Sequence, residues 1–221
     1  MKLLLSAIFK FIIGLLLVGV LLFLPAGSFE FVNGWLFIGL LFIPMLILGA
    51  VLFIKAPALL EKRLNAKEKE GAQKGVVAVS GLLFIAGFAV AGIDFRYNLS
   101  YVPAWAVIIA SVLLLVSYAL YAEVMRENAY LSRTVEVTEG QRVIDTGLYG
   151  IVRHPMYAVT VCLFLSIPVV LGSWWTLLCF LPYVPLIAVR VINEECFLER
   201  ELDGYTEYKK RVKYRLLPFV W

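Results

Sequence analysis

Charged side chains are scarce in this chain of 221 residues. Only 16% of the residues are charged and 62% are hydrophobic, whereas a soluble domain carries about 25% charged residues. A soluble fold of this length would have to bury far too much apolar surface, so the composition predicts an integral membrane protein. The net charge of +4 is modest and the basic residues are spread along the chain. We therefore expect no nucleic-acid partner.

Histidine and cysteine are also too few for a metal centre or a disulfide framework. The chain has one histidine, His154, and no second ligand stands at helical or loop spacing from it. The three cysteines, Cys162, Cys179 and Cys196, show neither a C-x-x-C motif nor a pairing pattern. We therefore expect neither a bound metal nor disulfides.

What the chain has in abundance is long apolar runs, and six of them can be marked. They run approximately over residues 3–24, 31–54, 76–93, 102–121, 156–171 and 174–192. A hydrocarbon core of about 30 Å needs about 20 helical residues, so most of these runs are long enough to span. The first run exceeds a typical signal-peptide core, which favours a retained membrane helix over a cleaved signal.

The last two apolar runs are separated only by Gly172 and Ser173, which predicts a tight helical hairpin. The fifth run is short, and Pro182 and Pro185 should kink the sixth. We expect an all-α integral membrane protein with about six transmembrane helices, with five as the alternative. A C-terminal hairpin and an interfacial tail helix would complete the fold, because Phe197, Leu198, Leu202 and Tyr205 recur at helical spacing.

The distribution of lysine and arginine predicts the orientation in the membrane. With six spans, every basic residue except Arg96 falls on one side. The positive-inside rule then places both termini and the polar segments in the cytoplasm. We expect residues 1–125 to form a membrane scaffold and residues 126–221 to form a catalytic region. Within the latter, 132–146 alternates apolar and polar residues, as an extended strand or a surface loop would.

Charge and polarity gather in the C-terminal third, where each feature has two interpretations. His154 lies in Arg153-His154-Pro155, which is consistent with a helix start or with a ligand contact. Arg190 and Glu194 share a helix face. They could form a simple salt bridge beside a snorkelling arginine, or face a polar cavity. The nearby tyrosines fit an interfacial belt as well as a ligand site.

Taken together, these motifs resemble a known family. Residues 147–157 read G-L-Y-G-I-V-R-H-P-M-Y, residues 190–198 read R-V-I-N-E-E-C-F-L, and Tyr205-x-x-Tyr208 and R-L-L-P follow at 205–218. In this order they resemble the isoprenylcysteine carboxyl methyltransferase and phospholipid methyltransferase superfamily, over about residues 132–221. One departure is Val159, where members of the family often have glycine.

The resemblance implies a membrane methyltransferase that uses S-adenosylmethionine, bound on the cytoplasmic side by the last two helices and their flanking loops. The cofactor contacts that it implies are Gln141, Arg142, Val143, Ile144, Tyr149, His154, Pro155, Met156, Tyr157, Glu194 and Glu195. Arg190 matches the arginine that orients the substrate and is the catalytic candidate. The acceptor would be a lipophilic or lipidated molecule taken laterally from the bilayer, and we expect the methylated group to be a carboxylate, as in isoprenylcysteine.

Two other functions share parts of this pattern. Membrane sterol reductases that use NADPH have a similar H-P-x-Y element and C-terminal pattern. A non-catalytic membrane scaffold or transporter subunit could retain the motifs as structure. Methyl transfer to a carboxylate suits the residues, because an ionised nucleophile needs no general base, and alignment of donor and acceptor is then the main task of the protein.

Overall fold

The computed structural model describes residues 2–64, 71–131 and 137–221, and every regular element within these ranges is helical. The first part of the chain forms long apolar helices and one short helix: α1 (Lys2–Ala26), α2 (Val32–Lys55), α3 (Pro57–Leu64), α4 (Gly71–Tyr97) and α5 (Ala104–Glu127). The all-α prediction is therefore confirmed, and α3 is an element that the apolar pattern did not predict.

The C-terminal half contains shorter helices, two of which are separated by a break at Pro182. They are the 3₁₀ turn η1 (Gly147–Gly150), α6 (Pro155–Val170), α7 (Trp174–Phe180), α8 (Tyr183–Glu201) and α9 (Tyr205–Arg211). The predicted kink is present, since the helix is interrupted between Phe180 and Tyr183, at Pro182. The tail prediction was wrong in one respect: it is two helices, because Gly204 adopts a left-handed conformation (φ 83°) between α8 and α9.

Five segments are long and apolar enough to cross a membrane, and α6 is a shorter apolar helix of 16 residues. At about 1.5 Å per residue, α6 is about 24 Å long. Its hairpin with α7 turns beside the α4–α5 loop, where the Trp174 backbone N–H donates to Ser100 Oγ (3.2 Å) and the Trp174 indole N–H to the Tyr101 carbonyl (3.0 Å). The predicted hairpin is confirmed, and five to six spans fit the bundle.

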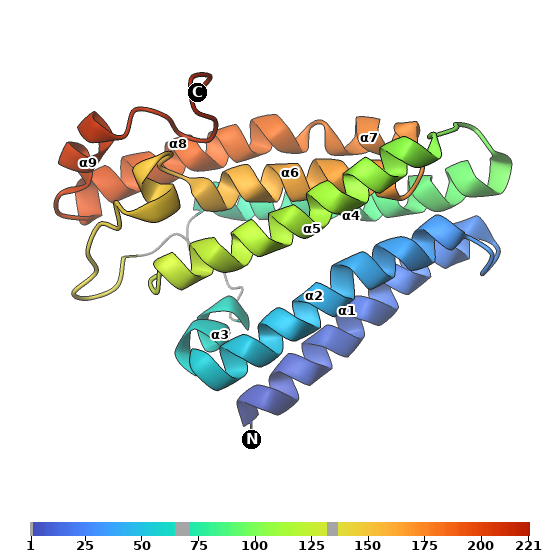
Figure 1. Cartoon of the computed structure of the whole chain (residues 1–221), viewed down its shortest axis with the longest axis horizontal. Coiled ribbons are helices and arrows are strands. Elements are labelled where there is room, and N and C mark those ends of the chain that lie inside the picture. Colours follow the sequence, from blue (N-terminus) through green and yellow to red (C-terminus); the bar gives the residue numbers. More distant parts are fainter. Residues whose placement is uncertain (1, 65–70, 132–136) are drawn as a thin grey trace.

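The helices form two groups that meet at one end of the bundle and diverge at the other (Figure 1). The groups touch where α1 crosses α4, because Gly92 lets the backbones approach: a Cβ there would lie 2.5 Å from the Leu22 carbonyl oxygen. From this point α1 and α2 slope away from the layer of α4, α5, α6 and α8. The cavity described below is lined by residues of both groups of helices.

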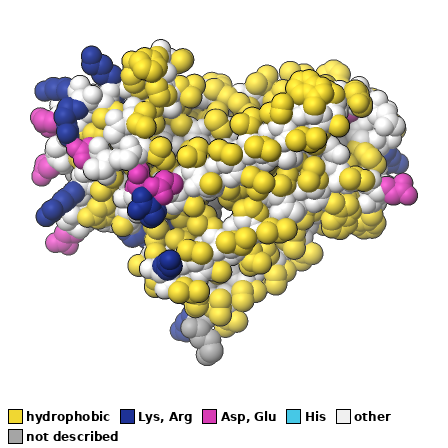
Figure 2. Space-filling model, viewed as in Figure 1, with side chains coloured by type: hydrophobic (Ala, Val, Ile, Leu, Met, Phe, Trp, Pro, Cys, Tyr) yellow, Lys and Arg dark blue, Asp and Glu magenta, His cyan; other side chains and the backbone are white. Residues whose placement is uncertain are grey.

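Polar and apolar surfaces are separated along the bundle (Figure 2). Hydrophobic side chains cover its flank, while most of the lysines, arginines and acids visible in this view gather at the diverging end. Arg96 lies at the far end, beside Gly27 in the α1–α2 turn. This separation matches the predicted grouping of basic residues at one end of the bundle.

Candidate functional site

A cavity of about 720 Å³ opens at the diverging end of the bundle, a size within the range of about 300–1,000 Å³ typical of ligand pockets. One part is apolar and extends between the membrane helices; its walls include Leu41, Met45, Leu48, Leu52, Val77, Phe84, Met125, Leu163 and Phe164. The other part is polar; its walls include Asn128, Gln141, Arg142, Tyr149, His154, Tyr157, Arg190 and Glu194. A single cavity therefore joins a hydrocarbon-like space to a polar one.

The floor of the polar part is the start of α6 and the segment before it. Pro155 occupies the first helical turn, as predicted, and His154 is the N-cap residue. The backbone N–H groups of Arg153 and His154 donate to the carbonyls of Tyr214 and Arg215, both at 2.9 Å. The C-terminal tail thus pairs with this segment and holds it in place.

Glu195 fastens the tail to the same segment. Its side chain is 2% exposed; Oε1 lies 2.6 Å from Arg153 Nε, and Oε2 lies 2.9 Å from Arg215 Nε. The Arg153 guanidinium also donates from Nη1 to the carbonyls of Val212 and Lys213, at 2.8 Å each. The two guanidinium groups neutralise the charge of the buried Glu195 carboxylate, so Glu195 stabilises the wall of the cavity.

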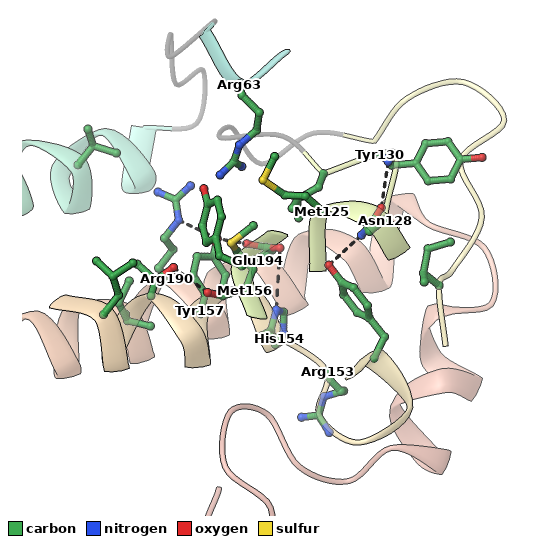
Figure 3. A pocket seen from close by; sticks show the side chains of 18 of the residues that line it. Arg63, Met125, Asn128, Tyr130, Arg153, His154, Met156, Tyr157, Arg190 and Glu194 are labelled. Carbon is green, nitrogen blue, oxygen red and sulfur yellow. Dashed lines mark hydrogen bonds and ion pairs between the residues drawn. The ribbon is translucent and has the colours of Figure 1, made fainter. Parts of the chain in front are cut away.

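Glu194 faces the cavity and belongs to a chain of three side chains. The Arg190 Nε–H donates to the Tyr157 hydroxyl at 2.8 Å, and that hydroxyl donates to Glu194 Oε2. The other oxygen, Oε1, is 4.0 Å from His154 Nδ1. Arg190 is only 8% exposed. The tyrosine hydroxyl therefore lies between the cation and the carboxylate, and all three residues line the cavity (Figure 3).

Tyr149 forms the opposite wall and is fixed from two sides. Its hydroxyl accepts a hydrogen bond from Asn128 Nδ2 (3.0 Å), and its carbonyl accepts one from the Tyr208 hydroxyl (2.7 Å). Burial raises the pKa of Tyr149 to about 12, although the hydrogen bond from Asn128 acts in the opposite direction. The phenol therefore stays protonated at neutral pH and keeps a proton to donate.

Tyr205 provides a polar group whose bonding is incomplete. Its side chain is 3% exposed and lines the cavity, and its hydroxyl has no hydrogen-bond partner among the described residues. Burial raises the pKa of this phenol above its usual value. A buried hydroxyl without a partner is costly and usually indicates a bound ligand or water. This orphan group supports a polar ligand in the cavity.

The structure brings together most of the predicted site residues. Those that line the cavity are Gln141, Arg142, Val143, Ile144, Tyr149, His154, Met156, Tyr157, Arg190 and Glu194. Pro155 and Glu195 are buried and do not line the cavity. Pro155 begins α6, and Glu195 forms the ion pairs with Arg153 and Arg215 that hold the tail. Val159 is buried but does not line the cavity. The glycine-to-valine departure therefore concerns helix packing and not the wall of this cavity.

The cavity lining contains residues that the sequence motifs did not predict, among them the polar residues Arg63 on α3 and Asn128 after α5. Arg63 lies near the end of α3 and Asn128 directly follows α5, and no sequence motif marks either residue. The nearest signal is that Arg63 lies in the basic segment between two apolar runs. The alternating segment 132–146 lies partly outside the described residues, and 137–146 has no regular structure. No group of side chains suited to a metal ion occurs in the described part of the chain.

Residues 104–203, from the start of α5 to just beyond α8, match the family model for phospholipid methyltransferases. The matched family belongs to the membrane methyltransferase group that also includes the isoprenylcysteine carboxyl methyltransferases, and the match covers just under half of the chain. No match was found among curated proteins. The family match contains η1, α6 and the Arg190–Glu194 helix, whereas α1–α4 lie outside it. The methyltransferase group therefore accounts for one wall of the cavity and not for the wall that α2, α3 and α4 provide.

Proposed function

We propose that the protein transfers a methyl group from S-adenosylmethionine to the carboxylate of a lipophilic acceptor. The observation that carries this proposal is the Arg190–Tyr157–Glu194 chain, which lines a cavity with a polar and an apolar part. In this scheme residues 126–221 carry out the transfer and residues 1–125 provide the membrane scaffold. The polar end would face the cytoplasm, where the cofactor is dissolved.

The polar part of the cavity has the groups that this cofactor requires. Glu194 offers a carboxylate to its cationic portion, and the Tyr205 hydroxyl offers an unused polar contact. Asn128 and Tyr149 provide an amide and a protonated phenol on the facing wall. Leu131, Val143 and Ile144 supply apolar surface for a purine ring. These residues fit the cofactor in charge and in polarity.

The apolar part suits an acceptor with a long hydrocarbon chain. It is walled by residues of α2, α4, α5 and α6, and Arg190 lines the same cavity. An arginine close to hydrocarbon is costly unless it faces a polar partner. Arg190 can hold an acceptor carboxylate, because the planar guanidinium matches a carboxylate with two parallel hydrogen bonds.

When bound, S-adenosylmethionine supplies a methyl group on a sulfonium; the methyl–oxygen bond of an ester forms as the methyl–sulfur bond breaks, and a neutral thioether leaves. A positive and a negative charge both disappear, so a site that excludes water does not oppose the reaction. The protein is required mainly to align the two reactants. The Tyr157 hydroxyl serves this purpose, since it fixes Arg190 relative to Glu194.

The test compares cofactors and then variants. S-adenosylmethionine, and not NADPH, should raise the melting temperature of the detergent-solubilised protein, because a ligand that binds only the folded state stabilises it. Glu194→Gln should reduce this protection, whereas Glu201→Gln on the same helix, outside the cavity lining, should not. Protection by NADPH would favour a sterol-type reductase, and protection by neither would favour a scaffold.

A further inference from the structure

We infer that Arg63 determines specificity together with Arg190, by binding the anionic group of the acceptor from the opposite side of the cavity. The inference rests on the proposed function and makes the acceptor an anionic amphiphile, a carboxylate, and not the amine of a phospholipid. Arg63 is on α3, outside the region that matches the family. The family match therefore does not include Arg63, and the role that we infer for this residue does not come from the family.

Helix α3 is held in a defined position, and this position fixes where the Arg63 side chain begins. Leu59 and Leu60 are buried, each 7% exposed, where α3 begins. At the other end, Lys10 Nζ on α1 donates to the Leu64 carbonyl at 2.6 Å. A cation at a helix C-terminus stabilises the unpaired carbonyls there. Helix α3 thus contacts α2, and its C-terminal end is bonded to α1.

The guanidinium of Arg63 is oriented toward the cavity. Its Cζ lies 5.3 Å from the centre of the Tyr121 ring on α5, a distance at which cation and ring attract. Arg63 lines the cavity, as Arg190 and Tyr157 do. Figure 3 shows Arg63 reaching down from α3, while Arg190 reaches up toward it from the opposite wall. The two guanidinium groups therefore face one space from helices that belong to different halves of the molecule.

The charges around this space favour an anion. Among the described residues that line the cavity there are four arginines, Arg63, Arg142, Arg153 and Arg190, and one acid, Glu194. Arg153 is directed at Glu195, and the arginines outnumber the acids in this lining. S-adenosylmethionine has two cationic groups and one carboxylate and so adds positive charge. The positive charge of this wall would repel an acceptor with an ammonium group. An acceptor carboxylate would neutralise part of that charge.

The experiment uses wild type, Arg63→Met, Arg63→Lys and the neighbour Lys62→Met, which lies on the same helix but outside the cavity lining. The probes are an N-acetyl S-prenyl cysteine and its uncharged carboxamide, which differ only in the anionic group. Thermal protection by each probe is measured without cofactor, and methyl transfer to the carboxylate is measured with it. Affinity for S-adenosylmethionine is measured separately by calorimetry.

We expect Arg63→Met to weaken binding of the carboxylate, and to raise its KM, about tenfold or more, because a charge partner in a partly desolvated site is lost. Binding of the carboxamide and of S-adenosylmethionine should change less than about twofold by the same argument. Arg63→Lys should restore part of the loss, since it keeps the charge but not the planar fork. Lys62→Met should resemble wild type.

Three results would overturn the inference. Equal losses for carboxylate and carboxamide would make Arg63 a structural residue, and a loss of cofactor affinity alone would assign it to the cofactor site. If wild type binds the carboxylate no better than the carboxamide, the assigned substrate class is wrong. Failure of the proposed function is a separate result, in which S-adenosylmethionine fails to bind the wild-type protein.

Discussion

Glu194 and Glu195 are adjacent in the sequence, yet their carboxylates have different surroundings. Glu195 is enclosed by Arg153 and Arg215, at 2.6 and 2.9 Å. Glu194 has a side chain that is 21% exposed, lines the cavity and accepts a hydrogen bond from Tyr157. Successive residues on a helix point about 100° apart, so one can hold the tail while the other faces a ligand.

Replacing Glu195 should affect mainly the stability of the fold, whereas replacing Glu194 should affect mainly the binding of S-adenosylmethionine. Glu195→Gln should lower the melting temperature markedly, because removing one member of a buried ion pair costs about 3–5 kcal/mol. Glu194→Gln should leave the melting temperature of the ligand-free protein nearly unchanged and raise the KM for S-adenosylmethionine. Thermal unfolding with and without cofactor measures both effects. Equal destabilisation by both variants would contradict the distinction.

His154 should matter for the cofactor more than for the fold. Its ring lies between the two acids, with Nε2 3.3 Å from Glu195 and Nδ1 4.0 Å from Glu194. His154→Ala should weaken S-adenosylmethionine binding and leave the protein folded in detergent, since the backbone bond from His154 to the Arg215 carbonyl is retained. Calorimetry measures the affinity. An unchanged affinity for S-adenosylmethionine would mean that His154 serves only as the N-cap of α6.

The Arg190–Tyr157–Glu194 chain should behave as an aligned set and not as one salt bridge. Arg190→Ala should leave cofactor affinity nearly intact and lower turnover, because the acceptor is no longer aligned. Tyr157→Phe removes the hydroxyl that joins Arg190 to Glu194. It should lower turnover while retaining most of the affinity for each ligand. In a plain salt bridge, loss of either charged partner would have similar effects, and that result would contradict the proposal.

Gly147 should be intolerant of any side chain. Its φ is +54°, and a Cβ there would lie 1.5 Å from Oε1 of Glu127, whose other oxygen accepts the Leu148 N–H at 3.0 Å. Gly147→Ala should therefore displace η1 and reduce both stability and cofactor binding. Gly140→Ala is the matched control, because Gly140 also has a positive φ (+72°) but open space at the Cβ position. Equal losses in the two variants would mean that backbone strain, and not the clash, is responsible.

The orientation can be tested by cysteine labelling. In a variant without native cysteines, a membrane-impermeant reagent applied from outside should modify Asn98→Cys in the α4–α5 loop. It should not modify Glu61→Cys on α3, because the positive-inside rule places that end in the cytoplasm. Permeabilised cells provide the control that both positions react. The reverse pattern would invert the proposed orientation.

Periodicity and motif order predicted much of this molecule, because both are local properties. The apolar runs identified the membrane helices, and Pro182 identified the interruption between α7 and α8. The motifs at 147–157 and 190–198 identified one wall of the cavity. Each of these signals depends on residues that are close in the sequence, and a helix converts such spacing directly into a shared face.

What the sequence did not predict depends on tertiary geometry. Arg63 reaches the cavity only because α3 is held against α1 and α2, which no periodicity reveals. The different surroundings of Glu194 and Glu195 depend on where the tail returns, about twenty residues later. The break at Gly204 was missed because Leu202 and Tyr205 continue the apolar spacing across it.

The pairing of the tail with residues 153 and 154 sets an order for biosynthesis. The backbone groups of Tyr214 and Arg215 that complete this pairing are made after every membrane helix of the bundle. The helices can therefore insert and pack while the floor of the cavity is still unfinished. The cavity would remain unable to hold a ligand firmly until residues 214 and 215 pair with residues 153 and 154, so a chain truncated before Tyr214 would be inserted but inactive.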